Sequence, residues 1–131
     1  MSIFPELKDV GEVIAERTLI LERRNKRRKK ITVLLGKPQM FPEGNPDYFC
    51  PFQVLGLGDD EVRCAAGVDA FQAIQLAQVG IGSHLHFRYR RRLGDGFYWL
   101  EKGDNLGFPE PLQDAGTETY RTKLERRFKK P

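Results

Sequence analysis

The cysteines and histidines of this sequence could act as nucleophiles, bases or metal ligands, and they are Cys50, Cys64, His84 and His86. A cysteine nucleophile needs a base positioned beside it, and a zinc site needs three or four ligands. On a helix the two histidines would point to opposite sides, and no third ligand accompanies them. We therefore expect reduced, partly buried thiols and structural histidines, with no metal, no cofactor and no catalytic residue.

Two other patterns that resemble catalytic or binding motifs have simpler interpretations. The glycine-rich stretch 56–58 could suggest a phosphate loop, but the acidic residues 59–61 follow it and would repel phosphate. A hairpin turn is the better interpretation. The only serines, Ser2 and Ser83, lack the context of a nucleophile elbow. The sequence favours a non-catalytic protein and leaves enzymatic activity open.

Positive charge is concentrated in three clusters, which hold most of the 22 Lys and Arg residues: 23–30, 88–92 and 121–130. Such clusters can bind nucleic-acid phosphates, and the aromatic residues at 89, 98 and 99 could stack on bases. The simpler interpretation is that the charges keep the protein soluble. If nucleic acid binds, the predicted contacts are Lys26, Arg27, Arg28, Arg90, Arg91 and Arg92.

The elements that must position these residues are mainly short strands. Branched and aromatic runs predict strands at 13–21, 31–35, 48–55, 61–65 and 97–100. The first basic cluster then forms the tip of a hairpin. Pro51 implies an edge or a bulge in the third strand, and we expect no regular element in the Pro-rich stretch 38–46.

A single long helix follows the fourth strand. Asp69 is its expected N-cap, and Gln72 completes a capping-box pattern. The helix should continue to about Arg92, with Gly94 at the C′ position. The predicted fold class is α+β, with about five mostly antiparallel strands packed against one long helix. Residues 1–111 should form a single domain, and 112–131 a basic C-terminal tail or short peripheral helix.

The helix contains no charged side chain between Ala70 and Phe87, although charged residues make up 31% of the chain. Its apolar arc spans roughly 220°, against the roughly 100° that packing on a sheet requires. Helical spacing places Phe71, Ile74 and Ile81 on one face, and we expect Ile74 and Ile81 to be buried against the sheet. The uncharged remainder suits a symmetric interface, unless another segment of the same chain covers it. The predicted interface residues are Gln72, Gln75, Leu76, Val79, Ser83 and His86.

Several short motifs resemble a family of small uncharacterised bacterial proteins: CPFQ at 50–53, GLGD at 56–59, GVDA at 67–70 and LGFP at 106–109. The resemblance extends over roughly residues 12–109. It implies a bacterial, cytoplasmic, compact α+β domain. The family has no assigned activity, so the resemblance implies no functional residues.

Two functional hypotheses result. The leading one is a non-catalytic bacterial domain that acts by self-association, as a homodimer, and by binding an unidentified protein partner. The alternative is a nucleic-acid-binding accessory protein that uses the basic clusters. No apolar run reaches the roughly 18 residues of a membrane span, and the N-terminus lacks the features of a signal peptide. We therefore expect a cytoplasmic protein without membrane contact.

Overall fold

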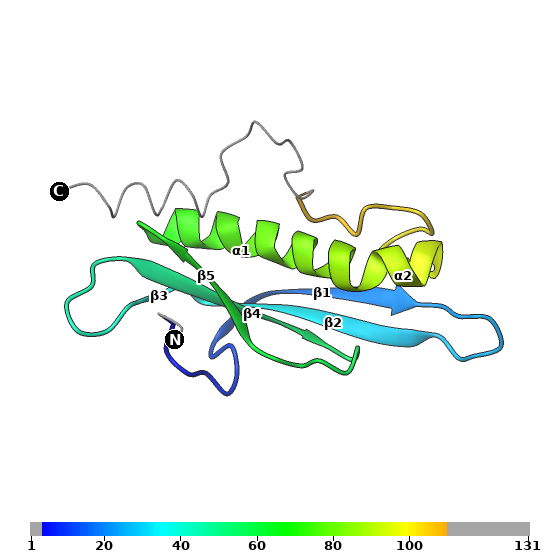
Figure 1. Cartoon of the computed structure of the whole chain (residues 1–131), viewed down its shortest axis with the longest axis horizontal. Helices are drawn as coiled ribbons and strands as arrows, with labels where there is room; N and C mark the ends of the chain where they lie inside the picture. The colour runs from blue at the N-terminus through cyan, green and yellow to red at the C-terminus, as the bar shows by residue number, and fades with distance from the viewer. Residues whose placement is uncertain (1–3, 110–131) are drawn as a thin grey trace.

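A computed structural model describes residues 4–109 of the chain. Within these residues, six strands form one antiparallel sheet, and one long helix packs across a face of it (Figure 1). Strands β4, β2, β1 and β6 are neighbours in that order; β3 and β2 pair with successive parts of one edge of β4, and β5 pairs with its other edge. The strands are β1 Val13–Leu21, β2 Lys29–Gly36, β3 Gln39–Met40, β4 Tyr48–Leu55, β5 Arg63–Gly67 and β6 Phe97–Tyr98.

The predicted α+β class is confirmed, and the bounds of β1 and β4 match the predicted ranges. The short strand β3 was not expected, and β5 begins two residues later than predicted. Strand β6 is shorter than predicted because the Asp104 carboxylate accepts hydrogen bonds from the backbone N–H groups of Trp99 and Leu100, at 3.1 and 2.8 Å. These bonds turn the chain away from the sheet.

Pro51 lies inside β4, a strand that is paired on both edges. Its Cα partner on β5 is Cys64. On the other edge, pairing with β3 ends at Phe49 and pairing with β2 begins at Phe52. Pro51 therefore lies where that edge has no ladder partner, a position that a residue without an N–H can occupy. The proline marks an interruption in the pairing rather than an outer edge.

The helix begins with the expected cap. The Asp69 carboxylate accepts from the backbone N–H of Gln72 at 2.8 Å, and the Gln72 side chain accepts from the N–H of Val68 at 2.8 Å. The helix then runs through α1 (Ala70–Leu85), a π-helical turn (His86–Arg90) and α2 (Arg91–Leu93). Gly94 ends α2 with a φ of 70°. The predicted continuation to about Arg92 is confirmed.

Two glycines inside α1 allow close approach of other parts of the chain. A Cβ atom at Gly80 would lie 3.1 Å from the ring of Phe52 on β4, and one at Gly82 would collide with the carbonyl oxygen of Pro109. Glycine weakens a helix by about 1 kcal/mol relative to alanine. Here it brings the helix close to the sheet on one side and lets residues 108–109 cross the helix on another.

The buried face of α1 is narrower than its apolar arc. Ala73, Ala77, Ile81 and Leu85 are each at most 1% exposed, and they face buried residues of β1, β2 and β4. Phe71, which helical spacing places on the same face as Ile74 and Ile81, is 80% exposed at the start of the helix. A Cβ atom at Gly67 on β5 would collide with the backbone of Ala73, so the helix lies close to the sheet at this point. The predicted burial of Ile81 is confirmed. Ile74 is only half-buried, and Phe87 is 46% exposed.

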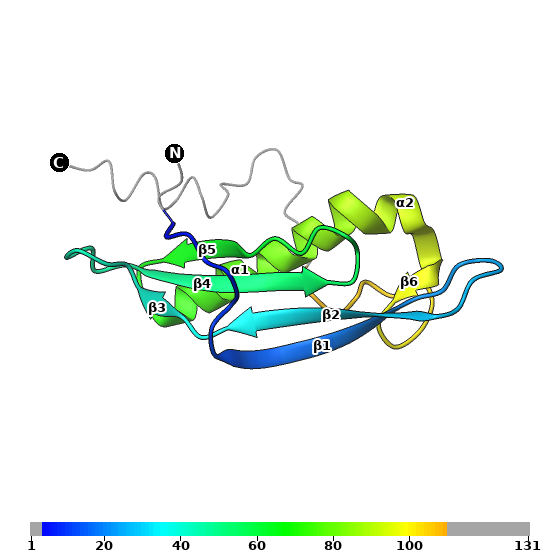
Figure 2. The ribbon, with the colours of Figure 1, turned by 90° about the horizontal axis from the view of Figure 1, so that it is seen from below.

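The opposite face of the sheet is partly covered by the segment that precedes β1, which crosses the strands on the side away from the helix (Figure 2). Val10 in this segment is 2% exposed. Phe4 contacts Phe41, with ring centroids 5.7 Å apart, and Phe41 contacts Phe49 at 5.1 Å. Both faces of β4 therefore carry buried side chains. Among residues 4–109, no helix combines the length and the apolar character needed to span a membrane.

The orientation of α1 can be tested with Ile81→Glu and Gln78→Glu. An unpaired charge at the buried Ile81 costs several kcal/mol, comparable to the stability of a typical domain. We expect urea denaturation, followed by circular dichroism, to show a greatly lowered midpoint or an unfolded chain. Gln78 is exposed, so Gln78→Glu should not lower the free energy of unfolding by more than about 0.5 kcal/mol. Equal midpoints for the two variants would contradict this orientation.

Candidate functional site

The two cysteines are poorly suited to nucleophilic chemistry. Cys50 is buried, and its thiol donates a hydrogen bond to the carbonyl oxygen of Gly36 at 3.3 Å. Burial raises the pKa of Cys50 to about 12 and that of Cys64 to about 11. Because the thiolate is the reactive form, both side chains are protonated at neutral pH. Neither is part of a disulfide, since Cys64 lies opposite Pro51 rather than opposite Cys50.

His84 and His86 both lie on the helix and have separate surroundings. The His84 ring contacts Tyr89, and the His86 ring contacts Phe87. Burial, and then the nearby positive charge of Arg63 and Arg88, lowers the pKa of His84 to about 4. His84 is therefore neutral at pH 7. Among residues 4–109, no three His, Cys, Asp or Glu side chains are grouped closely enough to hold a metal ion.

The glycine-rich stretch 56–58 forms the turn between β4 and β5, and the carboxylates that follow it are engaged within the chain. Asp59 pairs with Arg63 at 2.9 Å and with Arg88 at 3.6 Å, and Glu61 pairs with Arg63 at 3.6 Å. A backbone hydrogen bond from Glu61 is the main cause of the lowered pKa of Asp59. These ion pairs tie the turn to the helix and leave no phosphate-binding loop.

The six residues predicted to form an interface have different environments. Gln72 takes part in the helix cap, and Leu76 is buried, with 8% of its surface exposed. These two residues therefore pack within the chain. Gln75 is exposed, and the other three are half-buried: Val79, Ser83 and His86. The exposed side of the helix also includes Phe71, which was not among the predicted interface residues.

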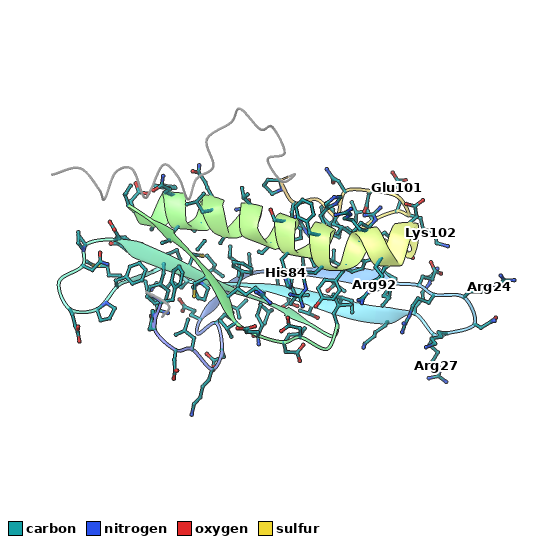
Figure 3. All side chains as sticks on the ribbon, in the orientation of Figure 1. Arg24, Arg27, His84, Arg92, Glu101 and Lys102 are labelled. Carbon is teal, nitrogen blue, oxygen red and sulfur yellow. The ribbon has the colours of Figure 1, made fainter. Side chains whose placement is uncertain are left out.

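Two basic clusters that are far apart in the sequence meet at one end of the molecule. Residues 23–28 form the tip between β1 and β2, and Arg91 and Arg92 lie on α2. Strand β6 pairs with the end of β1, and the backbone N–H of Glu22 donates to the carbonyl oxygen of Gly96 at 2.7 Å. Figure 3 shows Arg24, Arg27, Arg92 and Lys102 gathered at this end. The third cluster, 121–130, lies outside the described residues.

Some cations at this end are neutralised within the chain. Glu22 pairs with Arg28 at 2.8 Å and with Lys102 at 3.2 Å. Arg90 pairs with Asp95 at 3.7 Å and also donates to the carbonyl oxygen of Asp104. Eight exposed cations form no ion pair with any residue of 4–109, and we call this group the basic end: Arg23, Arg24, Lys26, Arg27, Lys29, Lys30, Arg91 and Arg92.

The aromatic residues predicted to stack on bases are not free to do so. Tyr89 and Tyr98 are buried, at 4% and 8% exposed. Trp99 stacks on the guanidinium group of Arg17, whose central carbon lies 3.8 Å from the ring centroid. Phe87 is the exposed aromatic residue nearest to the second cluster in sequence, and Arg91 lies 6.0 Å from its ring centroid. The basic end therefore offers cations for phosphates, without a stacking surface built from Tyr89, Tyr98 and Trp99.

Glu22 is the acidic centre that organises the hairpin tip, and sequence reasoning missed it. Its carboxylate accepts a hydrogen bond from the Tyr98 hydroxyl at 3.0 Å in addition to its two ion pairs. The hydrogen bond from Arg28, followed by those from Lys102 and Tyr98, lowers the pKa of Glu22 to about 2. The available signal was one acidic residue directly before a run of cations.

The pKa of Glu22 provides a test of this arrangement. Because it is lowered, the carboxylate stabilises the fold above its ordinary pKa of about 4.5, and this stabilisation is lost as the pH falls towards 2. In Arg28→Ala, we expect a carboxyl NMR titration to show the Glu22 pKa rising towards 4.5. Arg27→Ala, which removes a neighbouring cation without a contact to Glu22, should leave it near 2. Ordinary titration of Glu22 in the wild type would contradict the arrangement.

Comparison with known proteins supports the family resemblance. No curated protein and no solved structure matches the chain. The family DUF6968, described as a domain of unknown function, matches residues 15–110. The matched range contains all six strands except the first residues of β1, together with the whole helix. The chain therefore belongs to the DUF6968 family.

Proposed function

We propose that the protein binds nucleic acid through phosphate contacts made by the basic end. The observation that carries the proposal is the meeting of the hairpin tip and the helix end through the pairing of β6 with β1. Unneutralised cations from both clusters lie at this end. Binding such a surface to a phosphate backbone releases counterions, and this release supplies most of the affinity of non-specific complexes.

The geometry favours contacts to the backbone over base readout. Tyr89 and Tyr98 are buried, and the guanidinium group of Arg17 covers one face of the Trp99 ring. These three rings therefore supply no stacking surface for single-stranded bases. The cations instead lie on an exposed turn and a helix end. Phosphate contacts position a protein on a duplex without reading its sequence. The proposal is therefore sequence-independent binding to duplex nucleic acid.

The salt dependence of binding tests the proposal. We expect a labelled DNA duplex to bind in a fluorescence anisotropy titration at low salt, with affinity that falls steeply as salt rises. The double variant Arg27→Gln/Arg92→Gln removes one cation from each cluster. Because the logarithm of the association constant falls as the logarithm of the salt concentration rises, this slope is negative in the wild type. The double variant should reduce its magnitude by about two.

Lys37→Gln serves as the matched control, because Lys37 is an exposed cation at the far end of β2. Its slope should equal that of wild type. No binding at low salt, or equal losses in Lys37→Gln and the double variant, would show that the basic end is a solubility feature.

The second candidate function is self-association and partner binding through the exposed side of the helix. The supporting observation is that this side carries Phe71, 80% exposed, and no charged residue up to Phe87. A two-fold axis through an uncharged surface avoids like-charge repulsion. Of the residues predicted for this interface, Gln75, Val79, Ser83 and His86 remain at least partly exposed.

Gln75→Glu tests this second candidate. Gln75 is exposed, so in an isolated chain the substitution should change the free energy of unfolding by no more than about 0.5 kcal/mol. In a symmetric dimer the change brings two carboxylates together, so sedimentation should show weaker association while the fold is retained. Gln39→Glu, an equal change on the exposed strand β3, should leave the mass unchanged. A wild-type protein that stays monomeric at high concentration would rule out the dimer.

A further inference from the structure

Arg17 has a setting unlike that of the cations at the basic end. Its guanidinium carbon lies 3.8 Å from the ring centroid of Trp99 and 4.5 Å from that of Phe108. One guanidinium nitrogen donates to the carbonyl oxygen of Leu106 at 3.3 Å. Contacts with two aromatic rings and one carbonyl fix the position of the group, while most of its five N–H donors have no partner in residues 4–109.

The charge of Arg17 is not neutralised by an ion pair within residues 4–109. Glu16, the preceding residue, also lines the pocket beside Arg17, but strand alternation directs the two side chains to opposite faces of β1, and they form no ion pair with each other. Burial lowers the pKa of Arg17, yet an arginine stays protonated at neutral pH. A partly buried cation without a counter-ion favours the binding of an anion.

A pocket of about 170 Å³ lies beside Arg17, between β1, β2 and the helix. Ala15, Val33, Leu35 and Ile81 supply apolar lining, and polar lining comes from Glu16, Arg17 and Gln78. An engineered apolar cavity of about 150 Å³ can bind benzene, a molecule of about six heavy atoms. The volume and the lining therefore suit a ligand with one anionic group and a short apolar chain.

The wall of this pocket is held in place by the loop that follows β6. The Asp104 carboxylate accepts hydrogen bonds from the backbone N–H groups of Trp99, Leu100, Glu101 and Leu106. These bonds lower the pKa of Asp104, against the effect of its burial. Gly107, with a φ of 77°, passes so close to Trp99 that a Cβ atom would collide with the ring. The loop thus fixes Trp99 and Phe108 around the guanidinium group.

We propose that this Arg17 pocket binds a small aliphatic monocarboxylate. The carboxylate pairs with the free edge of the Arg17 guanidinium group, and the chain packs against Val33, Leu35 and Ile81. A phosphate would need more donors than Arg17 and Gln78 supply, whereas a carboxylate matches the planar guanidinium edge. This site is separate from the basic end, because it is small, largely apolar and centred on one cation.

Butyrate, with six heavy atoms, is a suitable probe, and Trp99 is a suitable reporter because it is the only tryptophan of the chain. We expect butyrate to change the Trp99 fluorescence in a saturable way, and the uncharged analogue butyramide to have a much smaller effect. Arg17→Gln should weaken butyrate binding at least about tenfold, since it removes a charge-assisted hydrogen-bonded pair.

Ala15→Leu tests the pocket without changing Arg17. Ala15 is exposed overall and lines the pocket, so the larger side chain should fill the space while the chain stays folded. We expect it to abolish the butyrate response, and Arg27→Gln at the basic end to leave the response unchanged. If Arg17→Gln does not fold, Ala15→Leu still tests whether butyrate binds in this pocket. An absent butyrate response in the wild type, an equal response to butyramide, or full binding by Ala15→Leu would overturn the proposal.

Discussion

The pairing of β6 with the end of β1 is the constraint on which the rest of the structure depends. Ile20 lies opposite Tyr98, and the N–H of Glu22 donates to Gly96. Because α2 ends only three residues before Gly96, this joint holds the end of the helix against the hairpin that follows β1. It also starts the loop that returns over β1 and surrounds Arg17. One short strand thus positions both the basic end and the Arg17 pocket.

The two sites place positive charge in opposite physical environments. The basic end consists of exposed, hydrated cations, for which each pairwise interaction is screened by salt. Its strength comes from the number of charges rather than from any single contact. Arg17 is partly desolvated between two aromatic rings. Its electrostatic attraction to a single bound anion is therefore stronger than that of an exposed cation. A nucleic acid therefore suits the first site, and a small carboxylate suits the second.

Local sequence signals predicted much of the fold. Asp69 and Gly94 marked the start and end of the helix, because caps depend on residues within one turn. The bounds of β1 and β4 followed from their branched and aromatic residues. The inward face of the helix followed in part: Ile81 is buried as predicted, whereas Ile74 is only half-buried against the core. An apolar arc wider than the contact with the sheet leaves some freedom in the rotation of the helix.

The sites depend on contacts between residues distant in the sequence, and these were harder to predict. The clusters themselves were visible, but their meeting depends on the pairing of β6 with β1. The aromatic residues were assigned the wrong role, since Tyr89 and Tyr98 are buried. The sequence alone indicates only that Arg17 lies in a strand. Its importance arises only when Trp99 and Phe108 close around it.

The central claim is that the hairpin tip and the helix end form one binding surface. The most direct test is an NMR titration of the wild-type protein with a short DNA duplex, following backbone amides along the chain. The claim predicts that Arg24 and Arg27 at the tip and Arg92 on α2 shift together, with one apparent dissociation constant, while Lys37 at the far end of β2 does not. Shifts confined to one cluster, or different dissociation constants for the two, would contradict it.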